Sequence, residues 1–378
     1  MPFTGKATYS AGASLPEIAE DVSDLIGINS PHETPLLDAL GDPARSARST
    51  VHEWLEDELL PNSGVIDTAS GNTITVFDAG RFRVGDQVRV ANQSEVMLVT
   101  AIDAGTEQLT VQRGYGGTGE ESIDDGQALL IIGNAALEGD DADAARFTTR
   151  SRKTNFTQIF TATVEVSGSE LAVRQIGVRD ELDYQKNQRT RELLRDLENS
   201  VINGRAADAN PQGSSSVRRT MRGILGHLAT HRFSPGSGGF PGDTDLTEDQ
   251  LNLALREIWN ASSGRIDLIV VGGRQKRAIN QFVATNRRFT AAGESFKDAI
   301  NVYESDFGVC RVVLSRSVPA GTVLLLDSSR IEVMPLSGRS FHYKSLANTG
   351  DRESGQVIGE YTLEFRNENA HGVIEGLL

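Results

Sequence analysis

Apolar and polar residues alternate most regularly near the C-terminus, in the eleven residues from Gln356 to Arg366. The apolar positions are Val357, Tyr361, Leu363 and Phe365, and the intervening polar positions are Glu360, Thr362, Glu364 and Arg366. A period of two predicts a half-buried strand, roughly 36 Å long at about 3.3 Å per residue. We expect its polar face to be a contact surface. So long a closing strand favours an extended plate over a compact enzyme domain.

Helical spacing marks two longer segments. The first runs from Asp180, a suitable N-cap, to Gly204, and its first half is almost wholly polar. This composition predicts a long helix that lies across a sheet and is exposed along much of its length. The second helix is expected from Thr247 to Ser262. A strand at Ile266–Val271, apolar apart from Asp267, and a helix at Gln275–Ala284 should follow.

Between Ser63 and Gly133, five short strand-like runs are separated by Gly- and Asp-containing turns. They predict a small β-barrel or sandwich. The flanking segments, Thr50–Leu60 and Asn155–Val166, have strand character themselves and together suggest one interrupted hairpin. The β-domain is therefore expected to be inserted into that hairpin.

Residues 1–48 are rich in small and polar residues, with isolated apolar anchors that include Leu36, Leu37 and Leu40. One helical turn is expected at Pro35–Ala39. Because a free arm cannot bury its own anchors, we expect them to be buried on a neighbouring molecule. The chain beyond residue 308 is expected to be rich in strands, at 309–315, 322–327 and 330–334.

Composition narrows the classes of function. The 378 residues suggest two or three lobes, and the formal charge of −15 argues against general coating of nucleic acid. The single cysteine, Cys310, excludes an intrachain disulfide and is expected in a buried strand. We expect no secretory peptide and no membrane span, since the apolar runs are short, and synthesis in the cytoplasm.

Candidate chemistry is sparse. The glycine-rich run Arg113–Gly119 is followed by acidic residues rather than a helix, which favours an inter-strand turn over a phosphate loop. His227 and His231 have the i, i+4 spacing of a zinc pair but lack an acidic third ligand. We therefore predict no catalytic residues, no metal site and no cofactor.

Arginine outnumbers lysine, with thirty-one arginines and six lysines among the thirty-seven basic residues. This excess favours bidentate pairing across subunit contacts. Lys153 precedes the return strand, and an isopeptide bond to an asparagine of a neighbouring molecule is one interpretation of it. The alternative, a solvated or ion-paired lysine, is the more common situation.

Several segments match a known family. The matching pieces are NSPHETPLLDALG (29–41), TVHEWLEDEL (50–59), TRELLRDLENSVINGR (190–205), RTMRGIL (219–225) and GEYTLEFRNENAHGVI (359–374). With these segments in this order, the chain resembles the major capsid protein of tailed bacteriophages, whose fold is named after phage Hong Kong 97. Residues 63–133 separately resemble a small β-module of phage structural proteins.

The resemblance implies an α+β fold of the Hong Kong 97 type with an all-β insertion domain. The implied parts are an N-terminal arm (1–49), an extended hairpin (50–62 and 144–168), the insertion domain (63–143), a peripheral domain (169–262 and 331–378) with a spine helix near 180–203, and an axial domain (263–330). Flexing between hexamer and pentamer is implied for the loops 210–216, 234–245 and 286–294.

The implied function is structural: hexamers and pentamers that form an icosahedral phage head around double-stranded DNA, which is enclosed without sequence-specific binding. Scaffold, portal and decoration proteins are possible partners, and the virion is the expected location. Expected subunit contacts are Leu36, Leu37, Trp54, Leu55, Arg150, Lys153, Arg287 and Arg288. A tail-tube protein, a nanocompartment shell protein and an enzyme are the alternatives.

Overall fold

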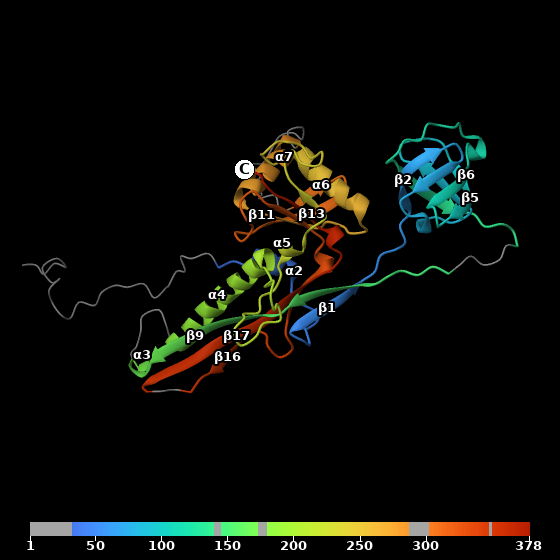
Figure 1. The fold of residues 1–378 in the computed structure, drawn as a ribbon. Helices are drawn as coiled ribbons and strands as arrows, with labels where there is room; N and C mark the ends of the chain where they lie inside the picture. Colours follow the sequence, from blue (N-terminus) through green and yellow to red (C-terminus); the bar gives the residue numbers. More distant parts are fainter. Residues whose placement is uncertain (1–31, 140–144, 173–179, 287–301, 348–349) are drawn as a thin grey trace, which may run out of the picture. The chain divides into compact units, whose positions relative to one another are not determined.

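The computed structural model describes residues 32–139, 145–172, 180–286, 302–347 and 350–378. The chain divides into two compact units (Figure 1). Unit 1 comprises residues 1–54 and 152–378, and unit 2 comprises Leu55–Ser151. Unit 2 therefore interrupts unit 1 in the sequence, within the segment that was expected to form a hairpin.

Unit 2 is a closed six-stranded barrel. Its strands are β2 (Ser63–Ser70), β3 (Thr73–Val76), β4 (Asp86–Val90), β5 (Met97–Asp103), β6 (Gln108–Gln112) and β7 (Ala128–Asn134), with 3-10 turns η1 (Ala79–Arg81) and η2 (Tyr115–Gly117). Twelve buried side chains form its own core, among them Ile66, Met97 and Leu109. The prediction of a barrel or sandwich is resolved in favour of the barrel.

The sequence predicted five strands for this domain and the barrel has six, because β2 was missed. Only Gly64 and Ile66 are buried within β2, while Asp67 and Thr68 face solvent, so this strand lacks an apolar run. The glycine-rich turn is confirmed. Gly114, Gly116 and Gly117 all have φ between 60° and 84°, a region that disfavours other residues.

The first sheet of unit 1 has six strands in the order β10, β18, β14, β11, β13, β12. The bounds are β10 (Arg232–Phe233), β11 (Leu268–Val271), β12 (Val302–Ser305), β13 (Gly308–Leu314), β14 (Val323–Leu326) and β18 (Gly372–Ile374). Strands β11 and β14 are buried at every position. Helices α6 (Glu248–Ala261) and α7 (Gly273–Asn286) belong to the same part of unit 1 and share its core.

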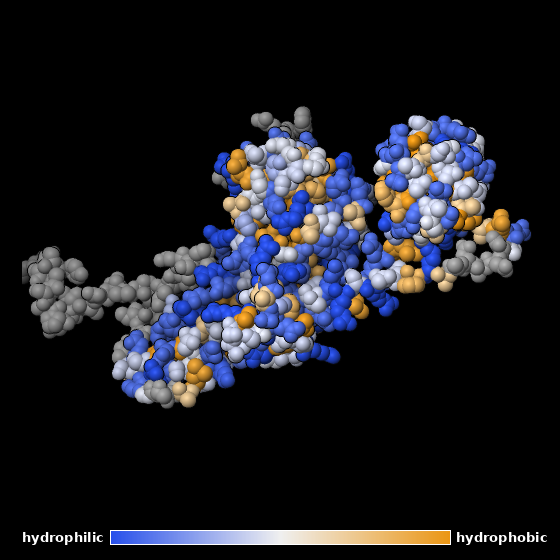
Figure 2. Space-filling view, viewed as in Figure 1, coloured by the Kyte–Doolittle hydropathy of each residue, from blue (hydrophilic) through white to orange (hydrophobic). Residues whose placement is uncertain are grey.

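The second sheet is built around β17 (Arg352–Phe365), the longest strand. On one edge it pairs with β15 (Ile331–Pro335) and β16 (His342–Ser345), and on the other with β9 (Gln158–Ser167). Helix α4 (Glu181–Asn203) packs on β9 and β17 through Leu193, Leu197 and Val201 (Figure 1). The described surface of α4 is mostly hydrophilic, as expected for a helix exposed along its length (Figure 2).

Short elements complete the fold, and two of them, β1 and β8, cross the boundary between the units in the sequence. They are α2 (Pro35–Leu40), β1 (Val51–Glu56), β8 (Ser151–Phe156), α3 (Gly168–Ala172), α5 (Ile224–His227), η4 (Ser328–Arg330) and η5 (Glu368–Ala370). Strands β1 and β8 pair with each other, as the interrupted hairpin predicts. The expected single return strand is divided, however, since Thr157 separates β8 from β9, and β9 pairs with β17 instead of β1.

Local signals at the helix ends were predicted well. The side chain of Asp180 accepts a hydrogen bond from the Asp183 amide, and Gly204 follows the last residue of α4. Thr247 and Gln250 form a reciprocal capping box at the start of α6. The predicted division into peripheral and axial domains stays a proposal. In the structure, β10 and β18 belong to the six-stranded sheet, although both lie outside the range 263–330.

Candidate functional site

The polar face of β17 is buried and paired within the chain. Glu360 is 3 % exposed, and its carboxylate accepts hydrogen bonds from Thr157 Oγ1 (2.6 Å) and Arg219 Nη2 (2.5 Å). Arg339 Nε lies 2.8 Å from the other carboxylate oxygen. Three segments that are far apart in the sequence therefore meet at a single carboxylate, which fixes them on β17.

A second carboxylate, Glu364, holds the N-terminal segment. Arg45 Nη2 lies 3.0 Å and His52 Nε2 2.6 Å from its oxygens, while Arg45 also binds Glu332 at 2.7 Å. Burial opposes ionisation of Glu364, but hydrogen bonds from His52 and Arg45 outweigh it and hold its pKa below the ordinary value. Residues before β1 and within β1 are thus anchored on the end of β17.

A third carboxylate, Glu198 on α4, holds helix α2. Its oxygens accept hydrogen bonds from the amides of Leu36 (3.1 Å) and Leu37 (3.5 Å) and from Ser315 Oγ (2.6 Å). Thr34 makes no side-chain cap, so Glu198 satisfies amides at the start of α2 that lack an intrahelical partner. Burial raises the pKa of Glu198, although these hydrogen bonds favour the ionised form.

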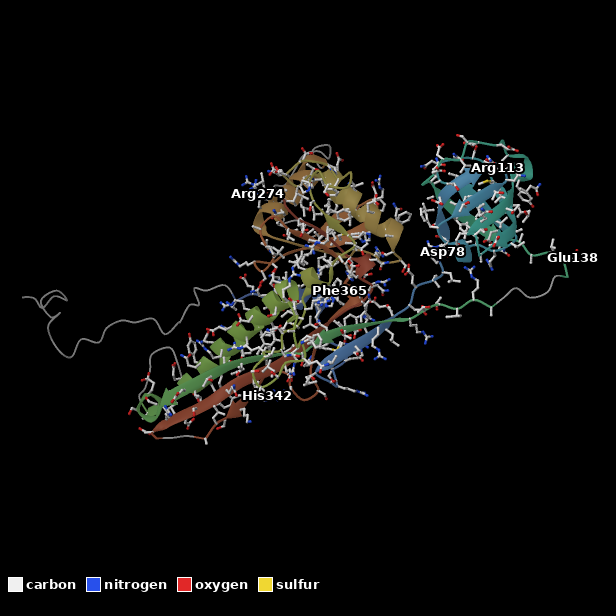
Figure 3. All side chains as sticks on the ribbon, in the orientation of Figure 1. Asp78, Arg113, Glu138, Arg274, His342 and Phe365 are labelled. Carbon is white, nitrogen blue, oxygen red and sulfur yellow. The ribbon has the colours of Figure 1, made fainter. Side chains whose placement is uncertain are left out.

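Aromatic rings form a continuous contact path beside these carboxylates. The ring centroids are 5.9 Å apart for His52 and Trp54, 6.1 Å for Trp54 and His227, 5.5 Å for His227 and Phe365, and 4.3 Å for Phe365 and His371. Figure 3 places Phe365 inside unit 1. The path connects β1 with α5, β17 and η5, so the first residues of the hairpin are packed as well as ion-paired.

The expectation that the polar face of β17 is an outer contact surface is therefore wrong. Glu360, Thr362 and Glu364 are at most 3 % exposed. A pattern of alternation shows which side chains share a face, but it does not show whether another segment covers that face. Here arginines from distant parts of the chain cover it. The arginine excess was the available signal, and it was assigned to contacts between subunits.

The expected contact residues of the arm are covered by the chain itself. Leu36 is fully buried in the core of unit 1, and Leu37 and Leu40 pack against that core. The expectation of burial on a neighbouring molecule is wrong for Leu36, because α2 docks on α4, β13 and β15. Leu37 and Leu40 are only partly buried, so their contact with a neighbour stays a prediction. Trp54 is also buried, at 8 % exposure.

Other expected contact residues lie on the surface. Leu55 is 62 % exposed, Arg150 forms an exposed ion pair with Asp57 (3.7 Å), and Lys153 is exposed on β8. Their role as contacts stays a prediction. Arg287 and Arg288 lie outside the described residues, as does most of the loop 286–294.

The described residues offer little for catalysis or metal binding. Among them, no group of three or more His, Cys, Asp or Glu side chains is placed to hold a metal ion. The expected helical histidine pair is not formed, because α5 ends at His227 and the chain turns before His231. Cys310 is buried in β13, and burial raises its pKa to about 11. No helix within the described ranges is long and apolar enough to cross a membrane.

Comparisons with known proteins give one family match and several structures of similar fold. A family model described as "SU10 major capsid protein" matches residues 3–378. No curated protein matches. Among solved structures, the capsid of a native GTA particle is similar over 99 % of this chain and 100 % of that chain, with 10 % identity and a TM-score of 0.57.

Two phage structures give similar results. A chain of Mycobacterium phage Bobi is similar over 98 % of this chain and 99 % of that chain, with 13 % identity and a TM-score of 0.52. A chain of Gordonia phage Cozz covers 99 % and 96 %, with 10 % identity and a TM-score of 0.53. At such low identity these likenesses show the fold alone: a mixed helix and sheet fold similar to those of phage capsid chains.

Proposed function

Because the chain belongs to the SU10 major capsid protein family, we propose that it assembles as hexamers and pentamers into an icosahedral phage head that encloses double-stranded DNA. The observation that carries the proposal is the family match over residues 3–378, with similarity to capsid chains over nearly their full length. The family is a structural one, which is not an enzyme class.

The finer fold assignment is part of this proposal. We assign α4 as the spine helix of a Hong Kong 97-type fold, the sheet around β17 as its peripheral domain, and the β1–β8 pair as the start of its extended hairpin. In support, α4 lies along β9 and β17, and β17 is the longest strand of the chain. Unit 2 would then be an insertion into the hairpin, as its place in the sequence suggests.

Exposed apolar side chains support self-assembly. Many large apolar residues with at least 40 % exposure belong to unit 2: Leu55, Leu59, Leu60, Val65, Phe77, Val84, Ile132, Leu137 and Phe147. Large exposed apolar groups are typical of interaction surfaces. Contacts between copies would remove them from water, which would add a favourable free energy to assembly.

Assembly is testable on the purified chain. We expect closed shells, or rings of five and six subunits, in negative-stain images, and fast-sedimenting species in the ultracentrifuge. Scaffold or portal proteins could be required, so co-expression with neighbouring phage structural genes is the second arm of the experiment. A chain that stays monomeric in both arms, at all salt and protein concentrations, would contradict the proposed function.

A further inference from the structure

Formal charge is divided very unequally between the two units. Unit 2 contains seventeen Asp and Glu residues against six Arg and no Lys, a net charge of −11. The other 281 residues contain thirty-five acidic and thirty-one basic residues, a net charge of −4. A quarter of the chain therefore carries most of its negative charge, which makes unit 2 a strongly acidic body.

Unit 1 carries a group of exposed basic side chains, which we call the basic surface: Lys153, Arg205 and Arg222. They lie on segments that hydrogen-bond to one another. Asn155, two residues after Lys153, accepts a hydrogen bond from the Arg222 amide (2.9 Å) and donates one to its carbonyl (2.9 Å). The Thr220 hydroxyl donates to the Arg205 carbonyl (2.8 Å).

The basic surface has no carboxylate partner within the described part of the chain. None of its three side chains forms an ion pair there, although most arginines of unit 1 do. Burial, together with the charges of Arg222 and Lys153, lowers the pKa of His227 to about 4 against the opposing charge of Glu368, which indicates that both cations act on the same region. Three uncompensated positive charges in a chain of net charge −15 are available for an acidic partner.

Unit 2 offers a matching group of carboxylates, which we call the acidic edge: Asp67, Asp124 and Asp125. All three are exposed and form no ion pair among the described residues. The Ile66 amide donates to the Gln127 carbonyl (3.0 Å), and the Gly126 amide donates to the Ile66 carbonyl (2.8 Å). These bonds bring β2 beside residues 124–127, so the three carboxylates gather at one edge of the barrel.

We propose that the basic surface of unit 1 docks on the acidic edge of unit 2 in a second copy of the chain. A ring of identical subunits needs a heterologous interface, in which two different and complementary surfaces of one chain meet. The basic surface of unit 1 and the acidic edge of unit 2 are two such complementary surfaces. Opposite charges would steer subunits together and fix their register more than they would add affinity. The inference rests on the proposed function, because it requires assembly.

The test uses charge reversal in the full chain, assembled as for the wild type. We expect Lys153→Glu/Arg222→Glu, and separately Asp124→Lys/Asp125→Lys, to raise the subunit concentration at which shells appear by about tenfold or more, because each places like charges opposite one another. The chain with all four substitutions should regain assembly. Lys344→Glu, which reverses an exposed charge on β16, is the matched control and should assemble as the wild type does.

The outcomes separate the inference from the proposed function. If the wild type forms shells and both reversed variants assemble as well as Lys344→Glu, the docking surface is overturned while the capsid function stands. Assembly that neither charge reversal impairs is also the result expected if the basic surface binds DNA phosphates, or unit 2 of its own chain, instead of a second copy. The docking surface is also overturned if both reversed variants fail to assemble and the variant with all four substitutions does not regain assembly. Far-UV circular dichroism of each variant before assembly identifies any that fails to fold.

Discussion

Replacing Glu360 by Ala should cost unit 1 about 3–5 kcal/mol of unfolding free energy, the usual effect of removing one partner of a buried ion pair. Arg219 is 17 % exposed in its side chain and would lose its carboxylate, and the buried Thr157 hydroxyl would lose its acceptor. Since domains are commonly stable by about 5–15 kcal/mol, this variant should lose a large fraction of its stability. Urea unfolding of the unassembled subunit measures the change.

Two comparisons make this prediction specific. Asp245 also pairs with an arginine, Arg274 (3.0 Å), but both side chains are more than 60 % exposed, so Asp245→Asn should change stability by less than about 1 kcal/mol. Glu360→Leu combined with Arg219→Leu should be less harmful than Glu360→Ala, since only the partly exposed Arg339 then loses this carboxylate. A loss below about 1 kcal/mol in Glu360→Ala would show that the carboxylate does not anchor these segments.

Acidification should destabilise unit 1 between about pH 6.5 and pH 4, before most carboxylates titrate. His371 is fully buried, with Nδ1 accepting a hydrogen bond from the Asp327 amide (3.1 Å) and Nε2 placed 3.2 Å from the Arg366 carbonyl. This arrangement needs the neutral ring. Burial lowers the pKa of His371 to about 4, and that of His227 to about 4 as well.

The direction in which stability changes with pH follows from the number of protons that the folded and the unfolded chain bind. In this window the unfolded chain binds protons that the folded chain lacks, so stability is full above pH 6.5 and falls as the pH falls towards 4. His371 alone contributes on the order of 3 kcal/mol. Glu198, whose pKa is raised, acts in the opposite direction, because its carboxyl is more easily protonated in the folded chain.

His227→Phe separates the histidine effect from other groups. The ring stacks on Phe365 and contacts Trp54, and its Nε2 has no hydrogen-bond partner among the described residues, so phenylalanine can keep the packing without the titration. Urea midpoints at pH 7, 6 and 5 should fall less steeply in this variant than in the wild type. Equal slopes, or a wild type unchanged between pH 6.5 and 4.5, would contradict the assignment of neutral buried rings.

Features encoded locally were predicted from the sequence. The Asp180 and Thr247 caps, the end of α4 at Gly204 and the existence of a long strand near the C-terminus depend on neighbouring residues and on a simple period. The expected strand, Gln356–Arg366, was too short, since β17 begins four residues earlier, at Arg352. The predictions that failed concern side chains whose partners lie far away in the sequence. Glu360 is covered by Arg219 and Arg339, and no local pattern links these positions.

The arm shows the same limit. Leu36 has an apolar side chain and a weak helical context, which fit either a neighbour or the chain's own core. The deciding contacts are with Glu198 and the strands of unit 1, more than 150 residues away. Strand β2 was missed for a different reason, because only two of its eight residues are buried, and one of these is a glycine.

A cryo-electron microscopy reconstruction of particles assembled from this chain tests the central claim most directly. The account predicts a closed shell with five-fold and six-fold rings, in which each subunit shows the sheet around β17 with α4 lying along it, and a separate six-stranded barrel. Particles without five-fold vertices, such as open tubes under every condition, or subunits in which α4 is detached from that sheet, would contradict it.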